Sequence, residues 1–230
     1  MISQLKYLGF ILLLFSLFPL ASCSNEDDVV KRLTSKQKET YAQNISGEYP
    51  GRYVIIYKNK DCIEGTDEAG RPITVAHSET FGDVQVDVSN DKTMHVFFQD
   101  FPISLISKVV DADKELSDAL AEAAPQAITA RYDLGYDTDY EQIKWAFTPN
   151  VMSLYLVYGG ADHHIRIEFN SNYNYICAAD ELTQPNSFLS LAKSGVALQL
   201  KAIYDGSNLI QRFGAEEGNY MHIIFKASPS

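Results

Sequence analysis

The chain has 230 residues and a formal net charge of −11 at pH 7, and its 14 Tyr and 12 Phe residues favour β-strands. A protein this acidic is not expected to bind nucleic acid, because that binding depends largely on basic side chains that neutralise phosphates. Anionic lipid head groups would repel it for the same reason, so contact with a membrane has to come from an apolar segment or a lipid.

Residues 1–22 have the pattern of a secretory signal peptide. Lys6 precedes an apolar run over residues 8–20, and two small residues then lead to Cys23. As a helix, this run would span about 20 Å, whereas the hydrocarbon core of a bilayer is about 30 Å thick. We therefore expect a cleaved leader rather than a transmembrane helix.

The residues Leu-Ala-Ser-Cys at positions 20–23 resemble a bacterial lipobox. The resemblance implies cleavage before Cys23, a diacylglyceryl thioether on its sulfur and usually a further acyl chain on the new amino terminus. Two or more acyl chains anchor a protein durably, whereas a single chain gives only marginal membrane binding. The alternative is a cleaved signal peptide without lipidation.

An acidic tract, Ser24-Asn25-Glu26-Asp27-Asp28, directly follows the lipobox. It resembles the surface-export signal of Bacteroidetes lipoproteins. This resemblance implies a lipid-anchored protein at the outer membrane that faces the cell surface. The alternative is a solvated tether that leaves the protein facing the periplasm. Loss of the leader removes one basic residue and no acidic one, so the net charge of the mature chain becomes −12.

The first predicted elements of the mature chain are a helix and a central strand. Thr34 and Gln37 fit a capping box, which predicts a short helix over residues 35–44. Residues 52–58 carry apolar side chains on both faces, as expected for a central strand. Residues 59–71 contain two glycines and predict a loop.

The next residues predict a hairpin followed by two helices. Valines alternate with polar residues over 84–88, and residues 94–98 follow after a polar turn, which predicts a hairpin with one solvated face. Residues 102–110 and 114–124 predict two short helices, the second of which ends at Pro125. Strand periodicity returns over residues 127–134, 143–147, 152–158, 165–169, 196–204 and 220–226.

Residues 45–53, Ile-Ser-Gly-Glu-Tyr-Pro-Gly-Arg-Tyr, resemble the opening of small Bacteroidetes lipoproteins of unknown function. Several of these are lipocalin-like, and a G-x-Y-x-G motif begins their first barrel strand. The resemblance covers the leader and the early part of the mature chain, and it implies no activity and no catalytic residue. The helices at 102–124 depart from a simple up-and-down barrel, so a β-sandwich stays open.

We therefore predict a mainly β fold: an antiparallel meander forming a lipocalin-like barrel or β-sandwich, with two short helices inserted near the middle and one short N-terminal helix. Links such as residues 89–92 are too short for parallel crossovers, which need a dozen or more residues. The predicted domains are a lipoprotein signal peptide at 1–22, the lipidated cysteine with its acidic tether and short helix at 23–44, and a single β-rich domain at 45–230.

Chemical motifs are scarce. The sequence contains no G-x-S-x-G elbow, H-E-x-x-H motif, P-loop or dinucleotide fingerprint. His163 and His164 are adjacent in a predicted strand, so they point to opposite faces and cannot hold one metal there. Asp137, Asp139 and Glu141 resemble half of a calcium loop, but the expected turn glycine is missing, which favours a solvated loop over an irregular calcium site. We expect no catalytic residue, metal or cofactor.

The remaining candidates are two cysteines and a group of tyrosines. Cys62 and Cys177 could form a disulfide in an oxidising compartment, although we favour two separate thiols. Four tyrosines lie before and after the strand at 165–169: Tyr155, Tyr158, Tyr173 and Tyr175. Their rings could stack on sugars, but aromatic side chains are also ordinary core residues, and we favour that reading.

The expected function is that of a non-catalytic cell-envelope lipoprotein. Its β-scaffold would display loops that bind a small ligand, a glycan or a protein partner. One alternative is a surface hydrolase acting on glycan or peptide, and another is a purely structural surface module. A deep apolar pocket would support binding, whereas clustered acids with raised pKa values would support catalysis.

Lipidation predicts a simple result for Cys23→Ala. Without the thiol there is no site for the thioether, so the variant should lose the acyl mass and leave the membrane fraction. Mass spectrometry of the mature protein and membrane partitioning measure both effects. An unaltered protein that is soluble and unlipidated would contradict the lipobox assignment.

Overall fold

The computed structural model describes residues 32–90, 94–138, 141–170, 173–191 and 195–228. Cys23, residues 24–28 and Asp139 therefore lie outside the described residues. The helices are α2 (Ser35–Ile45), the 3-10 helix η2 (Ile103–Val109), α3 (Lys114–Ala121), the 3-10 helix η3 (Ala179–Leu182) and α4 (Phe188–Leu191). No helix in the described ranges is long and apolar enough to cross a membrane.

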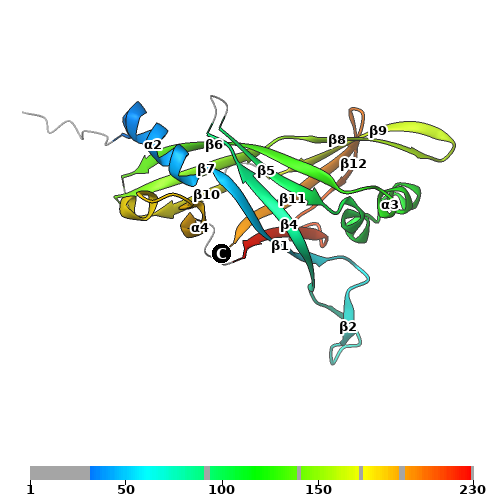
Figure 1. The fold of residues 1–230 in the computed structure, drawn as a ribbon. Helices are drawn as coiled ribbons and strands as arrows, with labels where there is room; N and C mark the ends of the chain where they lie inside the picture. Colours follow the sequence, from blue (N-terminus) through cyan, green and yellow to red (C-terminus); the bar gives the residue numbers. More distant parts are fainter. Residues whose placement is uncertain (1–31, 91–93, 139–140, 171–172, 192–194, 229–230) are drawn as a thin grey trace, which may run out of the picture. The chain divides into compact units, whose positions relative to one another are not determined.

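The strands are β1 (Gly47–Lys58), β2 (Ile63–Thr66), β3 (Pro72–Thr74), β4 (His77–Val88), β5 (His95–Phe101), β6 (Gln126–Asp137), β7 (Gln142–Pro149), β8 (Met152–Tyr158), β9 (Ala161–Phe169), β10 (Tyr173–Cys177), β11 (Val196–Asp205), β12 (Asn208–Arg212) and β13 (Tyr220–Ala227). Those of the large sheet follow the order β10-β7-β6-β5-β4-β1-β13-β11-β9-β8, and β12 pairs with β11. The sheet curls into an antiparallel half barrel (Figure 1). The predicted mainly β, antiparallel fold is confirmed, and the curl is consistent with a lipocalin-like barrel.

Alternation along the strands places the hydrophobic core on the inner face of the curl. In β1, Tyr49, Tyr53 and Ile55 are buried, whereas Glu48 and Arg52 are exposed. The largest fully buried side chains include Tyr53, Phe98, Phe101, Trp145, Phe147, Phe188 and Phe225. Burial of one such side chain contributes about 1.5–3 kcal/mol, so a slip by one residue would cost several of these contributions at once.

The predicted N-terminal helix is confirmed as α2. The Gln37 N–H donates to Thr34 Oγ1 at 3.2 Å, and the Thr34 N–H donates to Gln37 Oε1 at 2.9 Å. These two bonds form the capping box that the sequence predicts.

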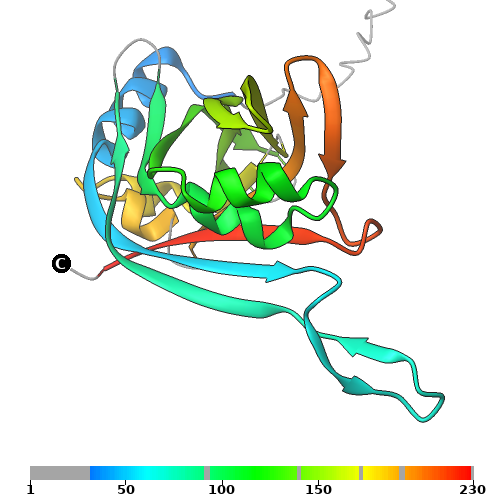
Figure 2. The same ribbon diagram turned by 90° about the vertical axis from the view of Figure 1, so that its right-hand side faces the viewer.

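The predicted loop at 59–71 is wrong, because β2 and β3 form a small hairpin that projects from the sheet (Figure 2). The residues of β2 are all exposed, so no apolar alternation marks them in the sequence. β10 and β12 were not predicted either, since both are five-residue strands. β1 and β4 begin before residues 52 and 84 because the first residues of each strand pair with the last residues of the other.

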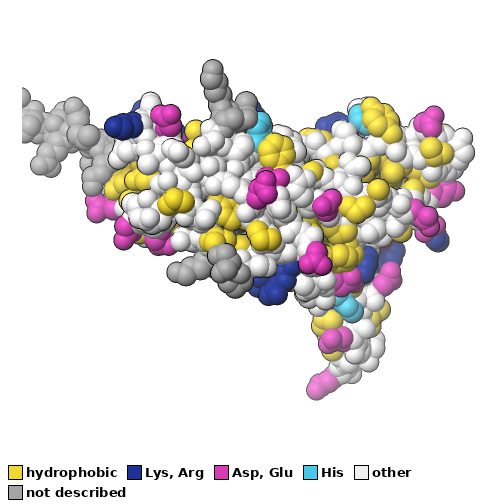
Figure 3. All heavy atoms as spheres, in the orientation of Figure 1, with side chains coloured by type: hydrophobic (Ala, Val, Ile, Leu, Met, Phe, Trp, Pro, Cys, Tyr) yellow, Lys and Arg dark blue, Asp and Glu magenta, His cyan; other side chains and the backbone are white. Residues whose placement is uncertain are grey.

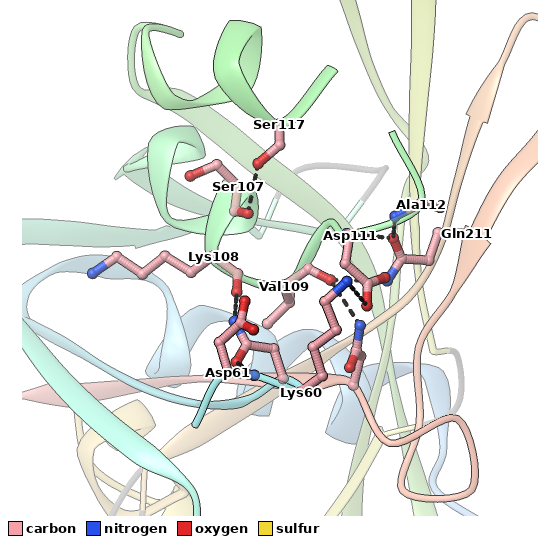
Figure 4. Close-up of polar contacts among 11 residues, drawn as sticks. Lys60, Asp61, Ser107, Lys108, Val109, Asp111, Ala112, Ser117 and Gln211 are labelled. Atoms are coloured by element: carbon pink, nitrogen blue, oxygen red, sulfur yellow. Dashed lines mark hydrogen bonds and ion pairs between the residues drawn. The ribbon is translucent and has the colours of Figure 1, made fainter. Parts of the chain in front are cut away.

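The predicted helical insertion is confirmed at 102–124, although its first helix is a 3-10 helix. Gln211, which is 9% exposed, holds this insertion on the sheet (Figure 4). Its Nε2 donates to the Val109 carbonyl at 2.8 Å, and its Oε1 accepts from the N–H groups of Asp111 and Ala112 at 3.0 and 3.1 Å. The Asn219 amide donates to the same Val109 carbonyl at 3.3 Å. One buried amide therefore satisfies three backbone groups of the segment between η2 and α3.

The register of β9 predicts opposite effects for neighbouring substitutions. Ile167 is fully buried, so Ile167→Asp should lower the free energy of unfolding by about 4–5 kcal/mol or prevent folding, because it buries a charge. Glu168 is half-buried and contacts Arg166 and Lys201 at 3.3 and 3.4 Å, so Glu168→Ala should cost about 1 kcal/mol or less. Denaturant unfolding compares the two, and equal losses would contradict the register.

Candidate functional site

The four tyrosines singled out in the sequence occupy opposite ends of the strand order. Tyr155 and Tyr158 lie on β8, whereas Tyr173 and Tyr175 lie on β10. The structure therefore does not bring them together as one aromatic site.

Tyr173 and Tyr175 connect β10 to β11. Both rings stack on Phe147, with centroids 5.0 and 6.1 Å away. Their hydroxyl oxygens accept hydrogen bonds of 2.6 Å from the N–H groups of Gln199 and Ala197, respectively. Burial raises the pKa of Tyr173 to about 12, so its hydroxyl stays protonated. These two tyrosines have a structural role, as the core reading predicted.

Tyr155 and Tyr158, in contrast, line a groove of about 590 Å³ between β8 and α3. Acidic and hydrophobic side chains gather at this end of the molecule (Figure 3). The lining residues from α3 and the turn after it are Glu115, Asp118, Ala119, Glu122 and Ala123. Those from β8 and its turn are Tyr155, Leu156, Val157, Tyr158 and Gly159.

The α3 wall of the groove is acidic because of how the helix is packed. Leu116 and Leu120 are buried, which turns Glu115, Asp118 and Glu122 toward solvent. Lys114 pairs with Asp118 at 2.7 Å and so compensates one of the three carboxylates. The wall therefore keeps a net negative charge.

The β8 wall is aromatic and aliphatic. Tyr155 and Val157 are 82% and 73% exposed, the two highest values among the exposed large hydrophobic residues in the described part of the chain. The Tyr155 ring stacks on His164 with a centroid distance of 4.8 Å. Burial, and then the negative charges of nearby aspartate and glutamate side chains, raise the pKa of Tyr158.

A network behind β8 holds this wall in place. The Tyr158 ring stacks on His163 with centroids 3.7 Å apart, and His163 Nδ1 lies 2.7 Å from the Asp205 carboxylate. The Gly206 N–H donates to the His164 carbonyl at 2.8 Å. The hairpin that forms the groove is therefore tied to the end of β11 by side-chain and backbone contacts.

The glycine turn brings the two walls close together at one end of the groove. Gly159 has a φ of 57°, and a Cβ atom built there would lie 2.7 Å from a carboxylate oxygen of Glu115. The next residue, Gly160, has a φ of 77° and open space around it. A side chain at Gly159 would displace the flexible end of Glu115, and the positive φ at both positions favours glycine in this turn.

A second hollow, of about 560 Å³, lies over β1, β4 and β5 and is less suited to a ligand. Its Asp87 carboxylate accepts hydrogen bonds from the Gln85 and Gln99 amides at 2.6 and 2.8 Å. Both carboxylate oxygens of this aspartate are therefore already hydrogen-bonded within the protein.

The groups with potential for catalysis are separated from one another. His163 and Asp205 form a contact that resembles part of a hydrolase site, but the aromatic ring of Tyr158 covers one face of the imidazole. Cys62 and Cys177 are buried free thiols, and burial raises the pKa of Cys177 to about 11. Within the described ranges, no group of three or more His, Cys, Asp or Glu residues is placed to hold a metal ion.

Sequence reasoning missed the groove itself. The available signal was in residues 152–158, where Ser153, Tyr155 and Val157 form an outward face that is more apolar than a solvated strand needs. The acidic wall gives a weaker signal, since charged residues on the exposed face of a helix are ordinary.

The comparisons with known proteins add a family. A family model described as Domain of unknown function (DUF4840) matches residues 44–197, which include both walls of the groove. No curated protein and no solved structure matches the chain.

The different roles of the tyrosines predict different effects of removing a hydroxyl group. Tyr175→Phe leaves the Ala197 N–H without its acceptor and should lower the free energy of unfolding by about 1–3 kcal/mol. Tyr155→Phe is the matched control, and it should change stability by less than about 0.5 kcal/mol because the residue is exposed. Thermal or denaturant unfolding measures both, and a harmless Tyr175→Phe would contradict the structural role.

Proposed function

The chain belongs to the family of the Domain of unknown function (DUF4840), and we propose that it is a non-catalytic cell-envelope lipoprotein that binds a ligand in the groove between α3 and β8. The half barrel would serve as a rigid support, with the groove at the end where the helical insertion meets the β8–β9 hairpin. The sequence predicts a ligand-binding role without a location, and the proposal assigns that role to this groove.

The proposed location depends on the N-terminal sequence. The lipobox ending in Cys23 and the acidic tract at 24–28 support a lipid-anchored protein of the Bacteroidetes outer membrane that faces the cell surface. The acidic composition of the mature chain supports the same anchor, because charge alone would not hold it on anionic lipid. The partners implied are the membrane, through the lipid, and one external ligand.

The observation that carries the binding role is the exposure of Tyr155 and Val157 along a groove that the protein has already formed. Exposed apolar side chains in a concave, partly polar site are typical of surfaces that bind other molecules. The contacts of His163 with Asp205 and of His164 with Gly206 fix the position of the hairpin before any ligand arrives. Such preorganisation reduces the entropy lost on binding.

A surface hydrolase is the second candidate, and the His163–Asp205 contact is the observation that favours it. A hydrolase of this kind also needs a nucleophile or an activated water beside the free imidazole nitrogen. The buried, protonated thiol of Cys177 does not suit that role. The binding function therefore has the stronger support.

The proposed function predicts that binding depends on the exposed ring of Tyr155. The mature protein would be tested against arrays of short peptides and oligosaccharides, and Tyr155→Ser should weaken any specific interaction by about tenfold or more. Ile73→Ser is a suitable control, because Ile73 is a 45% exposed apolar residue on the separate β2–β3 hairpin.

Two outcomes would contradict this assignment. One is that neither class of probe binds the mature protein. The other is that Tyr155→Ser and Ile73→Ser affect binding equally, which would place the binding surface elsewhere. Hydrolysis of a probe that disappears in His163→Ala would instead favour the enzyme.

A further inference from the structure

The β8–β9 hairpin leaves one edge of the large sheet without a partner. In the described part of the chain, β8 pairs with β9 alone and ends the strand order. Its two-residue turn, Gly159-Gly160, has positive φ at both positions, and in this type of hairpin the flanking pair Tyr158–Ala161 is hydrogen-bonded. Because hydrogen-bonded and non-hydrogen-bonded pairs alternate along the ladder, the backbone N–H and C=O groups of Ser153, Tyr155 and Val157 point to the open edge.

A second observation gives the same orientation independently. Tyr155 is paired with His164, and the His164 carbonyl accepts its hydrogen bond from Gly206 on the side away from β8. The Tyr155–His164 pair is therefore a non-hydrogen-bonded pair of the ladder, and its close ring stacking is typical of that position. The backbone of Tyr155 consequently points to the open edge and into the groove that the residue lines.

β8 lacks the features that usually protect an edge strand. Its sequence, Met-Ser-Leu-Tyr-Leu-Val-Tyr, contains no charged residue, proline or glycine, and its pairing with β9 shows no bulge. Edge strands are normally blocked by such features because they can pair with other chains. At the other end of the strand order, β10 contacts β11 through the hydroxyl groups of Tyr173 and Tyr175.

The opposite wall of the groove indicates which chain would suit this edge. Glu115, Asp118 and Glu122 face the space beside β8, and only Asp118 pairs with a cation in the described structure. Pairing of two β8 edges would bring two such acidic walls together in a protein of net charge −11, which disfavours a second copy. A segment with lysine or arginine side chains is complementary in charge.

We propose that the groove binds an extended, basic polypeptide segment that adds to β8 as a further strand. The proposal rests on the proposed function, because it names the ligand class for the same groove. An added strand would lie about 4.8 Å from β8 and exchange hydrogen bonds with Ser153, Tyr155 and Val157. Basic side chains would meet the carboxylates of α3, and apolar ones would pack on the exposed face of β8.

Hydrogen exchange of individual amides tests this geometry directly. The probe is a capped seven-residue peptide of alternating lysine and valine, titrated into the mature protein and followed by NMR. The amides of Ser153, Tyr155 and Val157 should exchange at least tenfold more slowly with the peptide bound. Those of Leu154 and Leu156 should already be protected in the free protein, since they pair with β9. A peptide of alternating glutamate and valine is the charge control.

Two sets of variants separate the backbone contribution from the charge contribution. Val157→Pro removes an N–H group from the open edge and leaves the β9 pairing intact, so it should weaken peptide binding at least tenfold. Val157→Thr keeps the N–H group and should change the affinity less than threefold. The double variant Glu115→Gln/Glu122→Gln should weaken peptide binding and make it less dependent on salt, because it removes two carboxylates from the groove. This variant tests the proposal even if Val157→Pro does not fold.

The outcomes distinguish this inference from the proposed function. If an oligosaccharide binds in a Tyr155-dependent manner and the lysine–valine peptide slows no edge amide, strand addition is wrong and the ligand-binding groove stands. If neither probe binds, both are wrong. If the edge amides become protected with rising protein concentration alone, the occupant is a second copy of the chain, and the basic-peptide proposal is wrong.

Discussion

The amide side chain of Gln211 joins the helical insertion to the sheet, and the groove depends on where that insertion lies. The groove needs α3 beside β8, and α3 belongs to an insertion that interrupts the regular succession of strands. From β12, which is remote in sequence, Gln211 binds the Val109 carbonyl at the end of η2 and the N–H groups of Asp111 and Ala112 in the link before α3. Buried backbone groups need such partners, because leaving one unpaired costs about 1–3 kcal/mol. A polar contact in the core therefore positions a surface feature.

The two end strands of the large sheet, β10 and β8, differ in where their tyrosine rings lie. At β10, aromatic rings fill the core and their hydroxyl groups bind the backbone of β11, so hydrophobic packing and hydrogen bonding are combined in the same side chains. At β8, the aromatic ring of Tyr155 instead lies outside the core. Tyr155 thus differs in role from Tyr158, Tyr173 and Tyr175, which pack against the core, and burial rather than residue type distinguishes it.

The parts of the fold that depend on local contacts could be predicted from the sequence. The capping box of α2 involves Thr34 and Gln37, which lie within one turn, and the valines of β4 show their inner face by alternation alone. Long-range pairing could not be predicted in the same way. β10 is identified as a strand by its pairing with β7, which the sequence does not show. β2 and β3 bury no apolar face, so no alternation of apolar residues predicts them.

The candidate site was less accessible to prediction than the fold, because its walls come from residues 115–123 and 155–159. These segments become neighbours only through the order of the strands and the attachment of the insertion. The sequence did contain the exposed face of β8, but an alternating apolar strand is normally read as part of a core. What distinguishes β8 is its place at the end of the strand order.

The buried thiols of Cys62 and Cys177 have a consequence for how the protein can be made. Because the folded chain contains both as free cysteines, the stability of the described structure includes no covalent cross-link. Folding should then be independent of the redox potential, so the mature sequence could be produced in a reducing cytoplasm as well as in an oxidising compartment. Oxidative damage would act mainly on unfolded chains, in which both sulfur atoms are open to attack by peroxide or by each other.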